Sequence, residues 1–313
     1  MDKTATTQGL PPLPGMSDGP VAGFDPAADV SHIRRKWLDI AYASTSPAQQ
    51  LDIYLPDSGG GPFPVIFYTH GGAFAMGDKR DIQVLASLRG LERGYAVVAV
   101  NYRLSGEAVF PACLQDVKAA LRWVRARSMD YCLDPGRIAA FGASAGGNLA
   151  AMLCVTAGLE MFDGPSLGNM ERVADVQVAV DWFGPTDFLM MDRHLAESGL
   201  GPTDHSEADS PESRYLGAPI TEVPKKVELA NPMTYVSKAM APMLIQHGDA
   251  DNLVPVQQSI EFARVIREKA GPQQVELDIL AGAGHGDPLF ATPQNMKRVF
   301  DFIDRHLHRE GNC

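Results

Sequence analysis

Continuous apolar runs alternate with amphipathic segments along most of this sequence. Runs such as Pro64 to Thr69 and Tyr95 to Val100 are typical of strands that are buried on both faces of a parallel sheet. Between such runs, apolar residues recur at i, i+3, i+4 and i+7, most clearly from Gln115 to Arg127, and this spacing predicts helices. Strands that alternate with helices in this way predict an α/β fold, in which helices flank a mostly parallel central sheet.

The predicted elements follow one another in a regular order. Strands are expected at 37–42, 50–55, 64–69, 95–100, 137–141, 176–183, 243–246 and 275–280. Helices are expected at 80–92, 115–127, 149–154, 256–270 and 296–307. The first two strands alternate apolar and polar residues and are separated by a short connection, so they predict an antiparallel hairpin at one edge of the sheet.

Two regions lack this rhythm. Residues 1–36 are rich in glycine and proline and show no periodicity, which predicts a loose N-terminal arm. Residues 187–237 mix methionine, histidine, glycine, proline and charged residues. A long irregular insertion in a compact domain is usually a functional lid or cap. We therefore predict one domain over residues 37–313, with a cap inserted at about 187–237.

The strongest chemical signal is a Gly-x-Ser-x-Gly turn with Ser144 at its centre, flanked by Gly142 and Gly146. A predicted buried strand precedes it and a predicted helix follows it, which is the context that a nucleophile elbow requires. The turn is so tight that only small residues fit two positions on either side of the nucleophile. This geometry would hold the Ser144 hydroxyl above the sheet, at the N-terminus of the next helix.

A serine nucleophile needs a base, and the base needs an orienting carboxylate. Among eight histidines, His285 is the best candidate for the base, because it lies in a glycine-rich loop just after the last predicted strand. Catalytic groups gather at the carboxyl ends of strands in such sheets. By the same criterion the carboxylate is Asp251, Asp249 or Asp187, and chain order does not separate the three. We favour Asp251, because a short loop that leads into the next helix would hold its side chain firmly.

Backbone N–H groups must also stabilise the negative charge that develops on the substrate carbonyl oxygen. The stretch His70-Gly71-Gly72 follows a buried strand, and its two glycines leave room for a ligand to approach the backbone. Together with the N–H of Ala145, just past the nucleophile, it predicts an oxyanion hole.

Composition and charge narrow the classes of function. The chain has 313 residues, of which 45% are hydrophobic, enough for a sizeable core. Its formal net charge of −11 argues against nucleic acid or an anionic membrane as a main partner, since both require a basic surface. The four cysteines show no metal-site or disulfide spacing. From this spacing we expect no metal site. Because no signal-peptide or transmembrane pattern is visible, we expect a cytoplasmic protein.

Four stretches resemble the α/β-hydrolase superfamily, and within it the esterases related to hormone-sensitive lipase and to the bifunctional feruloyl and acetyl-xylan esterases. The stretches are His70 to Phe74, Gly142 to Gly147, Asp251 to Pro255 and Gly284 to Gly286. The resemblance covers the chain from about residue 37 onward. It implies the α/β-hydrolase fold with a cap, Asp251 as the acid, and Gly71, Gly72 and Ala145 as the oxyanion donors.

Two positions differ from the hormone-sensitive-lipase pattern. Ala73 stands where those relatives usually have a third glycine, and Ala143 stands where they usually have aspartate. Both differences favour the feruloyl and acetyl-xylan type and leave the substrate open.

The leading hypothesis is a serine carboxylic-ester hydrolase that forms an acyl-enzyme on small-molecule esters with short acyl or aryl groups, such as acetyl or feruloyl esters, and needs no cofactor. Phe74, Met76 and Trp182 are expected to line its substrate pocket. An amidase-type enzyme such as an arylformamidase would use the same triad. A non-catalytic ligand-binding homologue would be expected to lack a triad member. The sequence leaves the oligomeric state open, with a homodimer among the alternatives.

Overall fold

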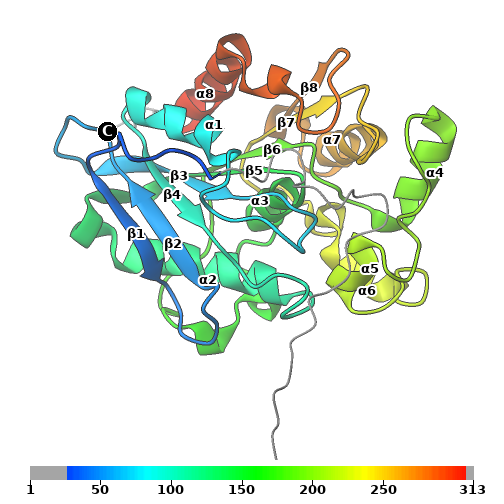
Figure 1. Ribbon diagram of the computed structural model, residues 1–313, viewed down its shortest axis with the longest axis horizontal. Coiled ribbons are helices and arrows are strands. Elements are labelled where there is room, and N and C mark those ends of the chain that lie inside the picture. The colour runs from blue at the N-terminus through cyan, green and yellow to red at the C-terminus, as the bar shows by residue number, and fades with distance from the viewer. Residues whose placement is uncertain (1–26, 308–313) are drawn as a thin grey trace, which may run out of the picture.

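A computed structural model describes residues 27–307 and shows one sheet of eight strands between two layers of helices (Figure 1). The strand order is β1-β2-β4-β3-β5-β6-β7-β8. The strands are β1 (Lys36–Ala41), β2 (Gln50–Tyr54), β3 (Phe63–Thr69), β4 (Ala96–Val100), β5 (Leu133–Ala143), β6 (Val178–Trp182), β7 (Met243–Gly248) and β8 (Val275–Leu280). β3 to β8 are parallel, whereas β2 pairs antiparallel with both β1 and β4.

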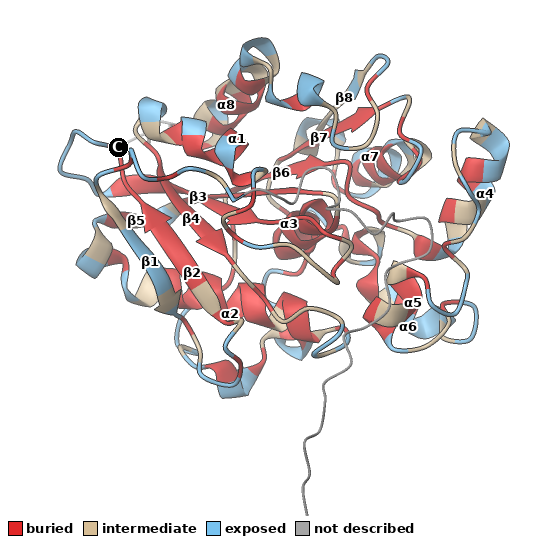
Figure 2. Ribbon diagram, in the orientation of Figure 1, coloured by how far each residue is buried: buried red, intermediate tan, exposed pale blue. Residues whose placement is uncertain are grey.

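The sheet has a hydrophobic core on each face because side chains alternate along its strands. In β3, Val65 and Phe67 face the core beneath α2, α3 and α7, whereas Ile66 and Tyr68 face the core beneath α1 and α8. Figure 2 shows the central strands and α3 as the most completely buried elements. The helices that cover the two faces are α1 (Val84–Leu88), α2 (Ala112–Ala126), α3 (Ala145–Val155), α7 (Gln257–Lys269) and α8 (Pro293–Leu307).

Short 3₁₀ helices complete the connections between these elements. They are η1 (Arg89–Arg93), η2 (Ser128–Tyr131), η3 (Glu160–Phe162), η4 (Pro165–Leu167), η5 (Pro232–Tyr235), η6 (Pro272–Gln274) and η7 (Pro288–Ala291). The predicted α/β fold class, the order of its strands and helices, and the antiparallel edge hairpin are confirmed.

The helix predicted over residues 80–92 is wrong in its extent. Only Val84–Leu88 is α-helical, and η1 follows it directly. Lys79 and Arg80 are held by ion pairs instead: the Lys79 ammonium lies 2.8 Å from Asp39, and the Arg80 guanidinium lies 2.6 Å from Asp52. Because both acids belong to the β1–β2 hairpin, these contacts fix the preceding segment in a non-helical path.

Of the two irregular regions, the structure describes the insertion in full and only the last part of the N-terminal arm. Residues 1–26, which make up most of the predicted arm, lie outside the described residues. The insertion at 187–237 contains α4 (Phe188–Ser198), α5 (Pro211–Leu216) and α6 (Pro224–Ala230), followed by η5. Phe188 and Tyr215 from α4 and α5 are buried in the same core as α2 and α3. The insertion therefore packs on the sheet's own core, while its role as a cap stays a prediction.

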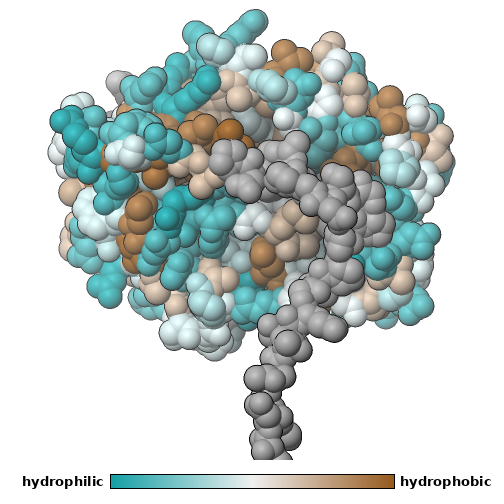
Figure 3. Space-filling view, in the orientation of Figure 1, coloured by the Kyte–Doolittle hydropathy of each residue, from teal (hydrophilic) through white to brown (hydrophobic). Residues whose placement is uncertain are grey.

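On the part of the face that grey atoms leave visible in Figure 3, hydrophilic residues surround small separate groups of apolar ones. Among residues 27–307, no helix is both long and apolar enough to span a membrane.

Candidate functional site

Ser144 lies at the turn between β5 and α3, with backbone angles of φ 56° and ψ −123°. Its N–H donates to the carbonyl oxygen of Trp182 at 2.8 Å, which ties the turn to the neighbouring strand β6. A Cβ at Gly142 would collide with the carbonyl oxygen of Gly146, and a Cβ at Gly146 would collide with that of Thr69. The two glycines are therefore required by the close approach of three backbone segments, and the turn holds Ser144 in a strained conformation.

The structure brings Ser144, His285 and Asp251 into one hydrogen-bonded chain. Nε2 of His285 lies 3.0 Å from Oγ of Ser144, and Nδ1 lies 2.8 Å from Oδ2 of Asp251. The three residues follow β5, β8 and β7, so the carboxyl edge of the parallel sheet assembles them from distant parts of the sequence. With Asp251 accepting from Nδ1, the Nε2 atom of a neutral His285 has its lone pair directed at the serine hydroxyl.

Asp251 is buried, and its carboxylate accepts several hydrogen bonds besides that of His285. Its Oδ1 accepts from the N–H groups of Leu253 and Val254, each at 2.9 Å. Nε2 of His247 lies 3.3 Å from Oδ2. Burial by itself would raise the pKa of Asp251, but His285 and the hydrogen bond from His247 outweigh it and lower the pKa well below its ordinary value. The carboxylate therefore stays ionised and can stabilise an imidazolium at His285.

His247 is a supporting residue to which the sequence analysis assigned no role. Its Nε2 lies 2.8 Å from the carbonyl oxygen of Val254, so this nitrogen carries the proton that Asp251 also receives. Its Nδ1 lies 2.6 Å from Oγ of Ser259, at the start of α7. The signal for it is weak in the sequence, because only its position at the end of a strand, four residues before Asp251, distinguishes it.

The two other candidate carboxylates lie elsewhere. Asp249 is exposed, and its Oδ1 accepts from the N–H of Gly282 at 2.6 Å. Asp187 lies at the N-terminus of α4, where burial raises its pKa. Of the three, Asp251 is the one whose carboxylate contacts His285.

The predicted oxyanion donors lie in the loop after β3 and at the start of α3. The N–H of Gly71 donates to Oε1 of Gln83 at 3.3 Å, so this N–H already has an acceptor within the protein. Gly72 has a φ of 113°, and a Cβ there would meet the backbone of Met76. Ala145 is the first residue of α3, where N–H groups have no intrahelical acceptor. The roles of Gly71, Gly72 and Ala145 as donors stay predictions.

His70 opens this loop and anchors it. Its ring stacks on that of Tyr102 with the centroids 4.4 Å apart, and the Tyr102 hydroxyl donates to the His70 carbonyl oxygen at 2.8 Å. Burial lowers the pKa of His70 to about 4. His70 is therefore neutral at physiological pH and holds the loop against Tyr102, which follows β4.

The three residues predicted to line the substrate pocket are placed differently. Phe74 is buried and stacks on Tyr215 of the insertion, with the ring centroids 3.9 Å apart. Trp182 is buried on the α8 face, and its indole N–H donates to Gln246 at 2.8 Å. Met76 is partly exposed. Phe183, the residue after Trp182, packs its ring 4.7 Å from that of His285. The contact of each with substrate stays a prediction.

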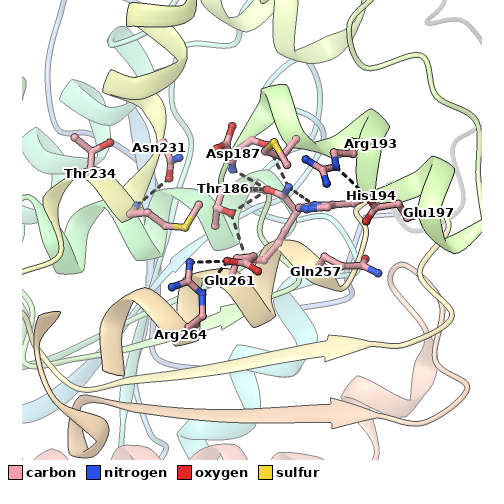
Figure 4. A pocket seen from close by; sticks show the side chains of 13 residues that line it. Thr186, Asp187, Arg193, His194, Glu197, Asn231, Thr234, Gln257, Glu261 and Arg264 are labelled. Atoms are coloured by element: carbon pink, nitrogen blue, oxygen red, sulfur yellow. Dashed lines mark hydrogen bonds and ion pairs between the residues drawn. The ribbon is translucent and has the colours of Figure 1, made fainter. Parts of the chain in front are cut away.

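A polar cavity of about 640 Å³ lies between α4, η5 and α7 (Figure 4). Its wall contains two ion pairs, Arg193 with Glu197 and Arg264 with Glu261. None of the three hydrogen-bonded residues Ser144, His285 and Asp251 lines it. Within residues 27–307, no group of three or more His, Cys, Asp or Glu side chains is arranged to hold a metal ion.

Comparison with known sequences gives a consistent assignment. The pattern of the BD-FAE family matches residues 51–266. The probable carboxylic ester hydrolase LipM of Mycobacterium tuberculosis is 33% identical over 232 residues, which are 74% of this chain and 51% of LipM. Esterase LipQ of the same organism is 32% identical over 272 residues, 85% of this chain and 61% of LipQ. This chain thus spans about half to three fifths of the length of these relatives.

Solved structures agree with the sequence matches. A truncated form of a carbohydrate esterase from gut microbiota superposes with a TM-score of 0.80 at 32% identity, covering 91% of this chain and all of that one. Est2, an esterase of Thermogutta terrifontis, gives a TM-score of 0.68 at 24% identity over 90% of this chain and 96% of Est2, a likeness that shows the fold alone. Because the BD-FAE pattern covers the sheet from β2 to β7, the Ser144 turn and the Asp251 loop, this chain belongs to the BD-FAE family of the α/β-hydrolase superfamily.

Proposed function

We propose that this protein hydrolyses carboxylic esters through an acyl-enzyme on Ser144. The observation that carries the proposal is the chain of hydrogen bonds from Asp251 through His285 to Ser144, at 2.8 and 3.0 Å. A serine hydroxyl placed next to a neutral, oriented imidazole can be deprotonated as it attacks. The matched sequence relatives named as ester hydrolases support this reaction.

The reaction has two halves. In the first, Ser144 Oγ attacks the ester carbonyl, His285 takes the hydroxyl proton, and the tetrahedral intermediate collapses as His285 returns that proton to the leaving alcohol. In the second, water attacks the acyl-enzyme, gives its proton to His285, and the carboxylic acid leaves as the proton returns to Ser144. Asp251 keeps the ring in one tautomer and balances the imidazolium charge that forms twice in each cycle.

For the substrate we propose a small-molecule ester with a short acyl or aryl group, such as an acetyl or feruloyl ester. The 32% identical structure described as a carbohydrate esterase supports this class. Phe74, in the loop after β3, stacks on Tyr215 of the insertion, so the insertion contacts the loop that holds the predicted oxyanion donors. We further propose that residues 187–237 act as the cap that limits acyl length.

Replacing the nucleophile tests the reaction. Ser144→Ala should leave the fold intact and lower kcat by about 10⁴-fold or more on nitrophenyl acetate, because no other group can form the acyl-enzyme. Nitrophenyl esters of increasing acyl length, with feruloyl and acetylated xylan substrates alongside, measure specificity, and the acetyl and feruloyl esters should be hydrolysed fastest.

Mass spectrometry after labelling with a fluorophosphonate provides the control. The adduct should be on Ser144 in the native protein and absent from Ser144→Ala, whereas Ser206→Ala should be labelled like the native protein. Labelling at another residue, or hydrolysis that survives in Ser144→Ala, would contradict the proposal. Faster cleavage of an aryl formamide than of an aryl ester would replace the substrate class with an amide.

A further inference from the structure

His205 is a buried histidine of the insertion, between α4 and α5, and both of its ring nitrogens face oxygen acceptors. Nε2 lies 3.0 Å from the carbonyl oxygen of Leu253, and Nδ1 lies 3.1 Å from Oε2 of Glu212 in an ion pair. The carbonyl can only accept, and an ionised carboxylate can only accept. The Nδ1–Oε2 contact lies within ion-pair distance but lacks hydrogen-bond geometry. A doubly protonated ring would supply an N–H toward each oxygen, so the two contacts favour an imidazolium at His205 beside an ionised Glu212.

The surroundings of His205 are acidic. Glu212 is buried in α5, while Asp192 of α4 accepts from the backbone N–H groups of His205 and Ser206, each at 2.9 Å. Burial opposes the charge on the ring, but Glu212, with smaller contributions from Asp192 and Asp204, raises the pKa of His205 above its ordinary value. The loop after β7 presents the carbonyl oxygen of Leu253 to the ring.

The carbonyl group of Leu253, which His205 contacts, belongs to the same peptide group as the Val254 N–H, which donates to Asp251. The oxygen of Leu253 and the nitrogen of Val254 share one planar unit, and the Val254 N–H donates to Oδ1 of Asp251 at 2.9 Å. A donor on the oxygen side fixes the plane and polarises the N–H on the other side. His205 is thus one rigid peptide away from the carboxylate that orients His285.

A second contact joins the insertion to the same loop. A Cβ at Gly201 would collide with the carbonyl oxygen of Asn252, so the insertion backbone lies directly against the residue after Asp251. The loop that carries Asp251 is therefore contacted by Gly201 and His205 of the insertion and by His247 of β7.

We propose that His205 and Glu212 are positioning residues, a charged latch through which the insertion holds Asp251 in place for His285, so that turnover falls when His205 loses its proton. This inference rests on the proposed ester hydrolysis. A group whose pKa is raised by folding makes its contribution below that pKa and loses it as the pH rises through it. Neutral His205 has only one N–H for two acceptors, so one of the two contacts becomes a repulsion between lone pairs.

The test compares pH profiles of kcat and KM for the native protein, Glu212→Gln and His205→Gln on nitrophenyl acetate. The native profile should fall on the alkaline side. Glu212→Gln removes the charge that retains the proton, so the midpoint of this fall should move down by one pH unit or more, with kcat at pH 8 reduced about tenfold and KM changed less than twofold. His205→Gln keeps a neutral donor for the Leu253 carbonyl, so its alkaline fall should disappear. His194→Gln, at another buried histidine of the insertion, should keep the native profile.

A direct titration of the ring completes the experiment. NMR of histidine-labelled native protein should show the His205 ring titrating above the ordinary value of about 6.5. A midpoint at or below that value, or an alkaline fall that is identical in the native protein and Glu212→Gln, overturns the latch, even if His205→Gln fails to fold. Hydrolysis that does not depend on Ser144 overturns the proposed function instead, and the titration then still decides whether the ion pair is charged.

Discussion

Two buried aspartates on neighbouring strands have opposite acid–base behaviour. Asp251 follows β7 and Asp181 lies in β6, and each is at most 1% exposed. The Asp251 carboxylate meets two backbone N–H groups and two histidine rings. Asp181 accepts from the N–H of Gly184 at 2.9 Å through Oδ1, and its Oδ2 has no hydrogen-bond partner in the part of the chain that the structure describes.

The difference in donors decides the charge. Burial raises the pKa of Asp181 to about 6, and one N–H from Gly184 does not compensate for it. The pKa of Asp251 is lowered although burial acts on it in the same direction. A buried carboxylate can therefore serve as the triad acid only where the fold supplies several donors to it. Three predictions test this contrast.

The largest effect on kcat is expected at Asp251, the carboxylate that receives several hydrogen bonds. Asp251→Asn keeps the shape, but its side-chain NH2 can donate to Nδ1, so His285 can adopt the wrong tautomer. We expect kcat to fall about 10³- to 10⁴-fold, with little change in thermal stability. Asp249→Asn and Asp187→Asn are the matched controls and should stay near the native rate. If Asp187→Asn showed the large loss and Asp251→Asn did not, the acid would have been assigned to the wrong strand.

A smaller effect is expected when one donor to Asp251 is altered. His247→Gln replaces the ring whose Nε2 lies between Asp251 and the Val254 carbonyl, so the carboxylate loses part of its orientation. We expect kcat to fall about tenfold with KM nearly unchanged, as for other supporting residues behind a site. Ser259→Ala, which removes only the partner on the far side of the ring, should cost less than threefold. Equal losses in the two variants would mean that the ring acts through packing alone.

The smallest effect on turnover, and a change in stability, is expected at Asp181. Because its pKa is raised by folding, the native protein loses stability as the pH rises from about 4 through about 6. Asp181→Asn keeps the acceptor for Gly184 and never ionises, so relative to the native protein it should gain about 1 to 3 kcal/mol between pH 4.5 and 7.5. Urea unfolding at both pH values measures this, and kcat should change less than threefold. A relative loss of stability at pH 7.5 would show that the ionised form is the one that the fold supports.

The parts of the site that could be predicted from sequence are those set by sterics within a short stretch. Gly142 is needed because the backbone of Gly146 occupies the space of a side chain, and that requirement is written into five consecutive residues. The space at Gly146 is taken by the backbone of Thr69 from β3, although the same five-residue pattern predicts the glycine. The succession of strands and helices along the chain follows in the same way from continuous apolar runs and helical periodicity.

Interactions between distant residues could not be predicted in this way. Nothing near His205 in the sequence indicates that its ring reaches Leu253, 48 residues away, or that its partner is Glu212. The extent of the helix predicted at 80–92 was wrong for the same reason. Asp39 and Asp52 of the β1–β2 hairpin, distant in the sequence, pair with Lys79 and Arg80. At Lys79 and Arg80 charged contacts made by the tertiary fold override the local pattern, whereas at His205 the local pattern gives no signal at all.

The order of the sheet also bears on how activity is gained during folding. Ser144 and His285 are 141 residues apart, and His285 follows β8, which lies at the edge of the sheet and pairs only with β7. A chain in which β8 has not yet docked on β7 can bury the core around β3, β4 and β5 while its serine still has no base. Recovered turnover therefore requires β8 in place, whereas circular dichroism reports the helices and strands of the whole chain.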